Sequence, residues 1–165
     1  MDPARGGTAQ PGLSARSRTI AGMNAAGSPT IALSPRIREF IAAPHYASLA
    51  TTEADGSPRQ AVIWYLSEGD ELVVNSRVGR RWPTNLLRDG RVYVAVFDEA
   101  DPMRWVGLLG TAEPVRDQQQ AQADIAAMAR RYEDPETAAG SIRAFEQQER
   151  ISFRIRVHAV HEHLD

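Results

Sequence analysis

The sequence contains neither cysteine nor lysine, so all 19 of its Lys-plus-Arg residues are arginine. The lack of cysteine excludes disulfide bonds, thiolate nucleophiles and thiolate metal sites. The lack of lysine excludes a Schiff-base lysine and a phosphate-loop lysine. An anion site in this protein must therefore be built from arginine side chains, backbone N–H groups and helix ends.

Other features are missing as well. No apolar run approaches the roughly 18 residues that cross a bilayer, and the N-terminus lacks the continuous apolar segment of a secretory signal. We therefore expect a cytoplasmic protein with no membrane partner. A net charge of −2 and a pI near 6.1 argue against a dedicated nucleic-acid binder, which usually has a basic face.

The bulk composition is that of one ordinary globular domain. The chain has 165 residues, of which 42% are hydrophobic and 24% charged, enough to bury a core without cross-links. Residues 1–33 are rich in Gly, Ala, Ser, Pro and Thr and are expected to form a disordered N-terminal extension. Residues 34–165 are expected to form the folded domain.

Strand and turn signals dominate the folded part. A helix is predicted after Ser34 and Pro35, which are typical of a helix start, and Asp55-Gly56 predicts a hairpin. Gly107 and Gly110 predict a bulge or sharp bend. The expected strands cover residues 46–52, 59–66, 71–76, 91–97, 104–115 and 150–163, and the expected helices lie at 83–89 and within 116–133 and 141–150. This pattern is mainly β and predicts a six-stranded antiparallel barrel with peripheral helices.

The stretch NSRVGRRWPTN is the best candidate for chemistry. Arg80 and Arg81 stand just before a predicted helix whose first N–H groups face the same space. Arginine forks beside a helix N-terminus form a site for phosphate. The alternative is a solvated turn in which the arginines pair with Glu71, Asp89 or Asp98.

A second candidate is the predicted strand RQAVIWYL. Alternation places Gln60, Val62 and Trp64 on one face, and Ala61, Ile63 and Tyr65 on the other. Small Ala61 beside large flat neighbours is suited to admit a planar ring into an apolar pocket. The alternative is a barrel core that Trp64 or Tyr65 fills.

Other chemistry is not indicated. His158, His161 and His163 near the C-terminus lack the further ligands and preformed geometry of a zinc site, so no metal site is expected. No Ser-His-Asp signature, paired-carboxylate pattern or G-x-G-x-x-G motif is evident. If the protein is an enzyme, an organic cofactor is therefore expected to carry its chemistry, and no catalytic residue is assigned.

The order of motifs resembles a known family. LATTEADGSP, then WY, GRRWPTNLLRDGRV and GTA are similar to the pyridoxamine 5′-phosphate oxidase-like split β-barrel flavoproteins. The resemblance covers about residues 36–158 and is strongest to the actinobacterial branch that uses the deazaflavin F420 or FMN. It implies a homodimer with cofactor sites at the subunit interface and a small-molecule substrate.

The resemblance also assigns residues to the cofactor. The ring would lie along the strand from residue 60 to 64, the ribityl chain and phosphate near the end of the next strand, and an aromatic residue near the interface. The residues expected to bind the cofactor are Gln60, Ala61, Val62, Ile63, Trp64, Asn75, Ser76, Arg80, Arg81, Trp82, Asn85 and Trp105. Two positions depart from the family pattern, because Trp82 stands where many relatives have lysine and Ala61 where many have Ser or Thr.

Three functional hypotheses follow. The first is an oxidoreductase that transfers hydride between F420, slightly preferred on the resemblance, or FMN and an unsaturated or quinone-like substrate. The second is a non-catalytic protein that binds or stores a flavin, F420 or haem in the same cleft. The third is a small barrel that binds single-stranded nucleic acid through Arg77, Arg80, Arg81 and stacking aromatics, against which the acidic pI counts.

Overall fold

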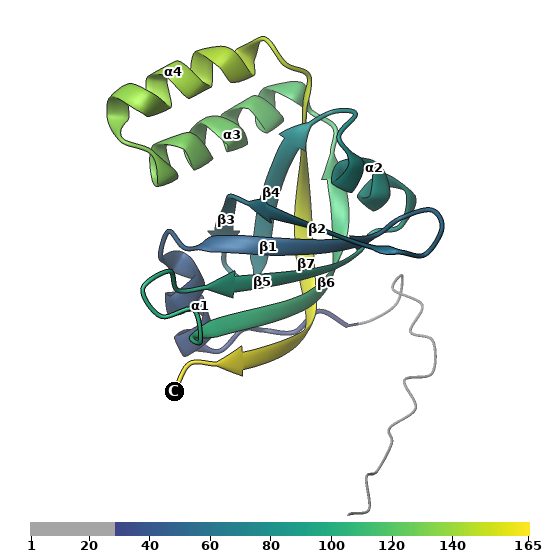
Figure 1. Ribbon diagram of the computed structural model, residues 1–165, viewed down its shortest axis with the longest axis vertical. Coiled ribbons are helices and arrows are strands. Elements are labelled where there is room, and N and C mark those ends of the chain that lie inside the picture. Colours follow the sequence, from purple (N-terminus) through teal and green to yellow (C-terminus); the bar gives the residue numbers. More distant parts are fainter. Residues whose placement is uncertain (1–28) are drawn as a thin grey trace, which may run out of the picture.

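The computed structural model describes residues 29–165, which form one curled antiparallel sheet with four helices (Figure 1). The strands are β1 (Tyr46–Thr52), β2 (Pro58–Ile63), β3 (Tyr65–Glu68), β4 (Glu71–Arg77), β5 (Arg91–Phe97), β6 (Trp105–Val115) and β7 (Arg150–His163). The helices are α1 (Pro35–Ala42), α2 (Arg81–Arg88), α3 (Gln118–Tyr132) and α4 (Pro135–Glu146). The strand order is β2-β1-β5-β6-β7-β4-β3.

The structure has seven strands where the sequence predicted six, because the strand predicted at 59–66 is broken at Trp64. Up to Ile63 the chain pairs with β1, and from Tyr65 it pairs with β4. The two edge strands of the sheet, β2 and β3, are thus consecutive in the chain and meet at Trp64. The sheet must curl to bring its two edges to this point. The main core, which includes Leu49, Val94 and Phe153, fills the inside of the curl.

The elements predicted from local sequence signals are present in the structure. Ser34 is the N-cap of α1, and its hydroxyl accepts a hydrogen bond from the Ile37 N–H at 3.3 Å. The β1–β2 hairpin turns at Gly56, whose φ of 86° is the left-handed conformation that glycine adopts without strain. The bend expected in β6 is a register shift between Leu109 and Gly110.

The predicted N-terminal extension lies mostly outside the described residues. Its last five residues, 29–33, lie against the sheet. The Ile31 N–H donates to the Val157 carbonyl at 3.0 Å, and Leu33 is buried with its N–H bonded to Asp70 at 3.0 Å. The packed part of the chain therefore begins before residue 34.

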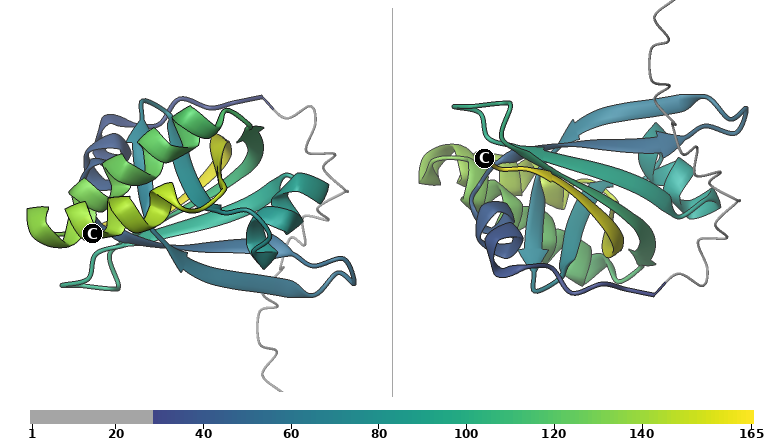
Figure 2. Two further views of the ribbon diagram at one scale, coloured as in Figure 1. Left: turned by 90° about the horizontal axis from the view of Figure 1, so that it is seen from above. Right: turned by 90° about the horizontal axis from the view of Figure 1, so that it is seen from below.

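Helices α3 and α4 pack side by side, and α3 lies against β7 and β4 (Figures 1 and 2). The second of these helices was predicted at 141–150, but it begins at Pro135 and ends at Glu146. The helix begins there because Asp134 caps its N-terminus. The Asp134 carboxylate accepts hydrogen bonds from the N–H groups of Glu136 and Thr137, both at 3.1 Å. Within the described part, no helix is long and apolar enough to span a membrane.

Candidate functional site

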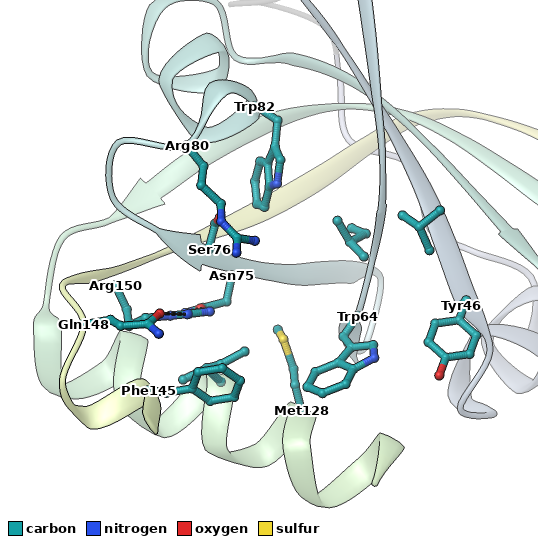
Figure 3. Close-up of a pocket in the computed structure, with 13 residues that line it drawn as sticks. Tyr46, Trp64, Asn75, Ser76, Arg80, Trp82, Met128, Phe145, Gln148 and Arg150 are labelled. Carbon is teal, nitrogen blue, oxygen red and sulfur yellow. Dashed lines mark hydrogen bonds between the residues drawn. The ribbon is translucent and has the colours of Figure 1, made fainter. Parts of the chain in front are cut away.

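A cavity of about 260 Å³ opens where the sheet is broken, between the end of β2, the end of β4 and the α3–α4 pair (Figure 3). Its wall is partly apolar and partly cationic. The lining residues are Tyr46, Val62, Ile63, Trp64, Asn75, Ser76, Arg80, Trp82, Ile125, Met128, Phe145, Gln148 and Arg150. We call this cavity the β4 pocket.

The β4 pocket exists because β4 is longer than β3. Strand β3 pairs with β4 only as far as Val74, whereas β7 pairs with β4 through Arg77. From Asn75 to Arg77, one edge of β4 therefore has no neighbouring strand in the part of the chain that the structure describes. Because side chains alternate along a strand, residues from both faces of β4 reach the cavity at this free edge.

On one face of β4, Ser76 lies beneath Arg80 and Trp82 (Figure 3). Ser76 is only 1% exposed, and its hydroxyl has no hydrogen-bond partner among the described residues. A buried hydroxyl without a partner costs free energy, and a ligand in the pocket can supply the missing partner.

The start of α2 lies at the same place. Arg80 is the N-cap residue of α2, and its side chain makes no capping hydrogen bond. Since Pro83 has no N–H, the first turn of α2 leaves the N–H groups of Arg81 and Trp82 for another acceptor, and the helix dipole favours a negative one. The Arg80 side chain extends over the pocket (Figure 3). Arg80, the start of α2 and Ser76 together form a candidate anion site.

On the other face of β4, Arg150 is buried, with 8% of its surface exposed. Its Nε and Nη2 donate to Asn75 Oδ1 at 2.9 and 2.7 Å, and its Nη1 donates to Gln148 Oε1 at 2.7 Å. The guanidinium lies over the Phe145 ring, 4.7 Å from the ring centroid. Arg150 thus joins β7 to β4 and to the end of α4.

The positive charge around the pocket is not balanced. Among residues 29–165, Arg77, Arg80 and Arg150 form no ion pair with a carboxylate. Arg77 and Arg150 lie directly opposite each other on β4 and β7. Burial, followed by the charges of Arg80 and Arg77, lowers the pKa of Arg150 to about 10. The folded chain thus disfavours this cation, and a bound anion would relieve the cost.

The rest of the wall is flat and apolar. The Trp64 ring stacks on Tyr132, with ring centroids 5.4 Å apart and an interplanar angle of 3°. Trp82 is buried against Phe153 at a centroid distance of 6.0 Å, and Met128 lies beside Trp64 (Figure 3). Aromatic and thioether side chains of this kind pack well against a planar ring.

Seven of the residues expected to bind the cofactor line this pocket. They are Val62, Ile63, Trp64, Asn75, Ser76, Arg80 and Trp82. Asn75 has no free donor, however, because both N–H groups of its amide are used, on the Ala121 carbonyl at 2.8 Å and on Ser152 Oγ at 2.9 Å. The geometry makes Asn75 a residue that positions Arg150.

The other five expected residues do not line the pocket. Gln60 is exposed and bonds to Ser48, and Ala61 packs against the main core. Arg81 points to Glu53, with which it forms an ion pair at 3.6 Å. Asn85 is buried and donates to Thr51 at 3.1 Å. Trp105 pairs with Phe97 and His163 at the start of β6.

The structure decides between anion site and charged corner, and between pocket and core, and the answer differs from one residue to the next. Arg81 takes part in a charged corner with Glu53, whereas Arg80 faces the pocket. Tyr65 belongs to the core, fully buried with its hydroxyl donating to the Ile41 carbonyl at 2.9 Å, whereas Trp64 lines the pocket.

Sequence reasoning missed six lining residues: Tyr46, Ile125, Met128, Phe145, Gln148 and Arg150. Most of them come from α3, α4 and the start of β7, far along the chain from β4. The one available signal was Arg150, a charged residue at the start of a strand whose next three residues are buried.

Within residues 29–165, the lining contains no Asp, Glu or His. Tyr46 is its one phenol, and the cations Arg80 and Arg150 are its charged groups. The pocket therefore lacks a conventional general base and a histidine that could ligate haem iron. It can bind an anion and seat a flat ring beside it.

The comparisons with known proteins agree with this fold. The model of the pyridoxamine 5′-phosphate oxidase family matches residues 33–163. The chain therefore belongs to this family, and the expected split-barrel fold is confirmed. We found no curated protein with a significant sequence match.

Several solved structures share the fold. An F420 reductase has a TM-score of 0.62 at 23% sequence identity, over 76% of this chain and 96% of that chain. A conserved hypothetical protein from Mycobacterium tuberculosis has a TM-score of 0.65 at 21% identity, over 79% and 84%. HutZ, the haem storage protein from Vibrio cholerae, has a TM-score of 0.61 at 22% identity, over 80% and 95%. At such low identity the likeness concerns the fold alone.

Proposed function

We propose that the protein is an oxidoreductase whose β4 pocket binds F420 or FMN. The observation that carries the proposal is the combination of an anion site at Arg80 and Ser76 with a flat apolar wall in one cavity. A cofactor with a planar ring and a phosphate group matches both the apolar wall and the anion site. The F420 reductase among the similar structures supports this choice of cofactor class.

Different residues of the pocket would bind different parts of the cofactor. Arg80 and the start of α2 would hold the phosphate through charge-assisted hydrogen bonds. The Ser76 hydroxyl would gain its missing partner from the same group. Ile63, Trp64 and Met128 would pack against the ring and exclude water from it.

The bound cofactor would supply hydride transfer to or from a small unsaturated or quinone-like substrate. The chain itself would orient the two reactants and shield them from water. Among the lining side chains, the Tyr46 hydroxyl is the one uncharged O–H donor besides Ser76. If the reaction needs a proton from the protein, Tyr46 is the residue placed to give it.

We also propose that the protein is a homodimer with the cofactor sites at the subunit interface. Val62 stands at the pocket with 71% of its surface exposed, which leaves an apolar side chain uncovered in the single chain. On β5, buried valines alternate with the partly exposed aromatic residues Tyr93 and Phe97. A second copy that covers this face would also close the pocket.

An absorbance titration of the full-length protein tests the cofactor proposal. F420 and FMN are added separately, and we expect the ring spectrum of at least one to shift, with saturation at micromolar concentrations. A spectrum that neither cofactor perturbs would sink the proposal. The cofactor that binds then identifies which of the two the pocket selects.

A second candidate function is a non-catalytic protein that binds or stores the same cofactor. The absence of Asp, Glu and His from the lining favours it, because most general acid–base catalysis uses these side chains. The haem storage protein HutZ has the same fold. A steady-state assay with the reduced cofactor and a panel of quinones and enones separates the two, since tight binding without turnover would favour storage.

A further inference from the structure

The Arg150 guanidinium has N–H donors that no residue in the described part of the chain uses. A guanidinium carries five N–H donors. Three hydrogen bonds satisfy one donor on each nitrogen: Nε and Nη2 to Asn75 Oδ1, and Nη1 to Gln148 Oε1. One N–H on Nη1 and one on Nη2 therefore remain for a ligand, and two such donors match the oxygens of a carboxylate or phosphate.

Arg150 lies on the opposite side of β4 from Arg80 and Ser76. Figure 3 shows Ser76, Arg80 and Trp82 on one side of the strand and Arg150, Phe145 and Met128 on the other. The alternation of side chains agrees, because Asn75, the partner of Arg150, precedes Ser76 by one residue. Two cationic positions thus flank the free edge of β4.

A purely structural role does not account for the charge of Arg150. Its hydrogen-bond partners Asn75 and Gln148 are neutral, and its favourable contact as a cation is with the Phe145 ring. A neutral side chain could join the two amides without the cost of burying a cation. Arg77 stands opposite it on the neighbouring strand, and a like charge there is destabilising. An anion in the pocket would turn this unfavourable arrangement into a favourable one.

We propose that the β4 pocket binds a ligand with two separate anionic groups, one held by Arg80 and Ser76 and the other by Arg150. Asn75 and Gln148 fix the guanidinium so that its two remaining N–H donors face the second group. Arg150 is therefore a ligand-binding residue, and Asn75 positions it.

This inference rests on the proposed function and sharpens its choice of cofactor. FMN carries one anionic group, its phosphate, whereas F420 carries a phosphate and, beyond it, glutamate carboxylates. Two anion positions on the two faces of β4 match F420. The preference for F420 thereby gains a basis in the residues of this chain.

The test compares dissociation constants for F420 and FMN, measured by fluorescence titration of the full-length protein and its variants. We expect Arg150→Gln to weaken F420 binding by about tenfold or more and FMN binding by less than about threefold. Arg150→Lys, which keeps the charge, should recover part of the F420 affinity. Arg80→Gln should weaken both cofactors.

Arg154→Gln is the matched control, because Arg154 lies on the same strand but pairs with Glu68 outside the pocket. It should leave both affinities unchanged. If Arg150→Gln leaves F420 binding unchanged, or weakens FMN by the same factor as F420, the two-group proposal is overturned.

A second readout separates this proposal from the cofactor proposal. The thermal midpoint Tm is measured with increasing inorganic phosphate, which requires no flavin. We expect phosphate to raise the Tm of the wild type, each of Arg150→Gln and Arg80→Gln to reduce that rise, and the double variant to remove it. Equal rises in the wild type and Arg150→Gln would overturn the Arg150 site, even if a cofactor binds.

Discussion

At the scale of one residue, replacing Ser76 is expected to weaken ligand binding with little effect on stability. Its buried hydroxyl makes no hydrogen bond within residues 29–165, so replacing Ser76 by Ala removes no hydrogen bond of this part of the chain. We expect Ser76→Ala to change the free energy of unfolding by no more than about 0.5 kcal/mol and to weaken binding of the phosphate-bearing cofactor by about tenfold. Urea unfolding and cofactor titration measure the two quantities.

Ser152 provides the matched control for this prediction. It is also fully buried, but its hydroxyl accepts a hydrogen bond from Asn75 Nδ2 at 2.9 Å. Ser152→Ala should therefore destabilise the protein by about 1 kcal/mol, since it leaves a buried donor unpaired. If Ser76→Ala costs as much stability as Ser152→Ala, the Ser76 hydroxyl has a structural partner and the anion site loses its main support.

The sequence indicated which part of the chain forms the pocket, but it did not show which of two neighbouring side chains faces the pocket. Ser76 and Arg80 were found because a predicted strand end precedes a predicted helix start. Sequence could not tell Arg80 from Arg81, because only the exit direction of each side chain sends one to the pocket and the other to Glu53. Arg150 had only a weak signal, as a charged residue before a buried run, and its contact with Asn75 spans 75 positions of the chain.

At the scale of elements, Asp70 joins the β3–β4 turn to α1 and to the segment before it. Its carboxylate accepts hydrogen bonds from Arg38 Nε at 2.8 Å and from the Leu33 N–H at 3.0 Å. Arg38, followed by the Leu33 N–H, holds the pKa of Asp70 below its ordinary value. The ionised carboxylate therefore stabilises this attachment.

The sign of the pH dependence follows from this lowered pKa. The stabilisation is present above the unfolded-state pKa of 3.8 and is lost as the pH falls through the folded-state value. We expect Asp70→Asn to lower the Tm at pH 7, with a difference from the wild type that shrinks below about pH 4. Asp165→Asn is the control, because Asp165 is 96% exposed in its pair with Arg36 and should have little effect. A difference that persists undiminished at low pH would contradict the assignment.

Elements with a local start or turn signal were predictable from sequence. Ser34-Pro35 and Asp55-Gly56 act on the backbone within a few residues of themselves. The break at Trp64 was not predictable, because the alternating pattern continues across it and only the change of pairing partner from β1 to β4 divides the strand. Tyr132 covers this break, with its hydroxyl 2.8 Å from the His45 carbonyl and 3.4 Å from the Tyr65 nitrogen.

At the scale of the whole molecule, the curled sheet explains why one pocket gathers residues from distant parts of the chain. The two sheet edges meet at Trp64, and α3 and α4 cover the side where β4 is left unpaired. The family resemblance predicted this architecture from motif order. The helices over the pocket follow no motif, so their contribution became clear only from the packing.

The proposed homodimer gives a prediction at this scale. The chain has a mass of 18.2 kDa, and we expect sedimentation equilibrium to give twice that value at micromolar concentrations. Because the proposed interface covers Val62 and the pocket mouth, cofactor binding should strengthen dimerisation. A monomer at all concentrations, with and without cofactor, would contradict the proposed interface.

We propose that Arg80, and not its neighbour Arg81, holds the phosphate of a flavin-type cofactor in the β4 pocket. The most direct test is the dissociation constant of the bound cofactor in Arg80→Ala and Arg81→Ala, which differ by one position and carry the same change in charge. We expect Arg80→Ala to weaken binding by about tenfold or more, while the affinity of Arg81→Ala stays close to that of the wild type. Equal effects of the two variants, or no effect of either, would contradict it.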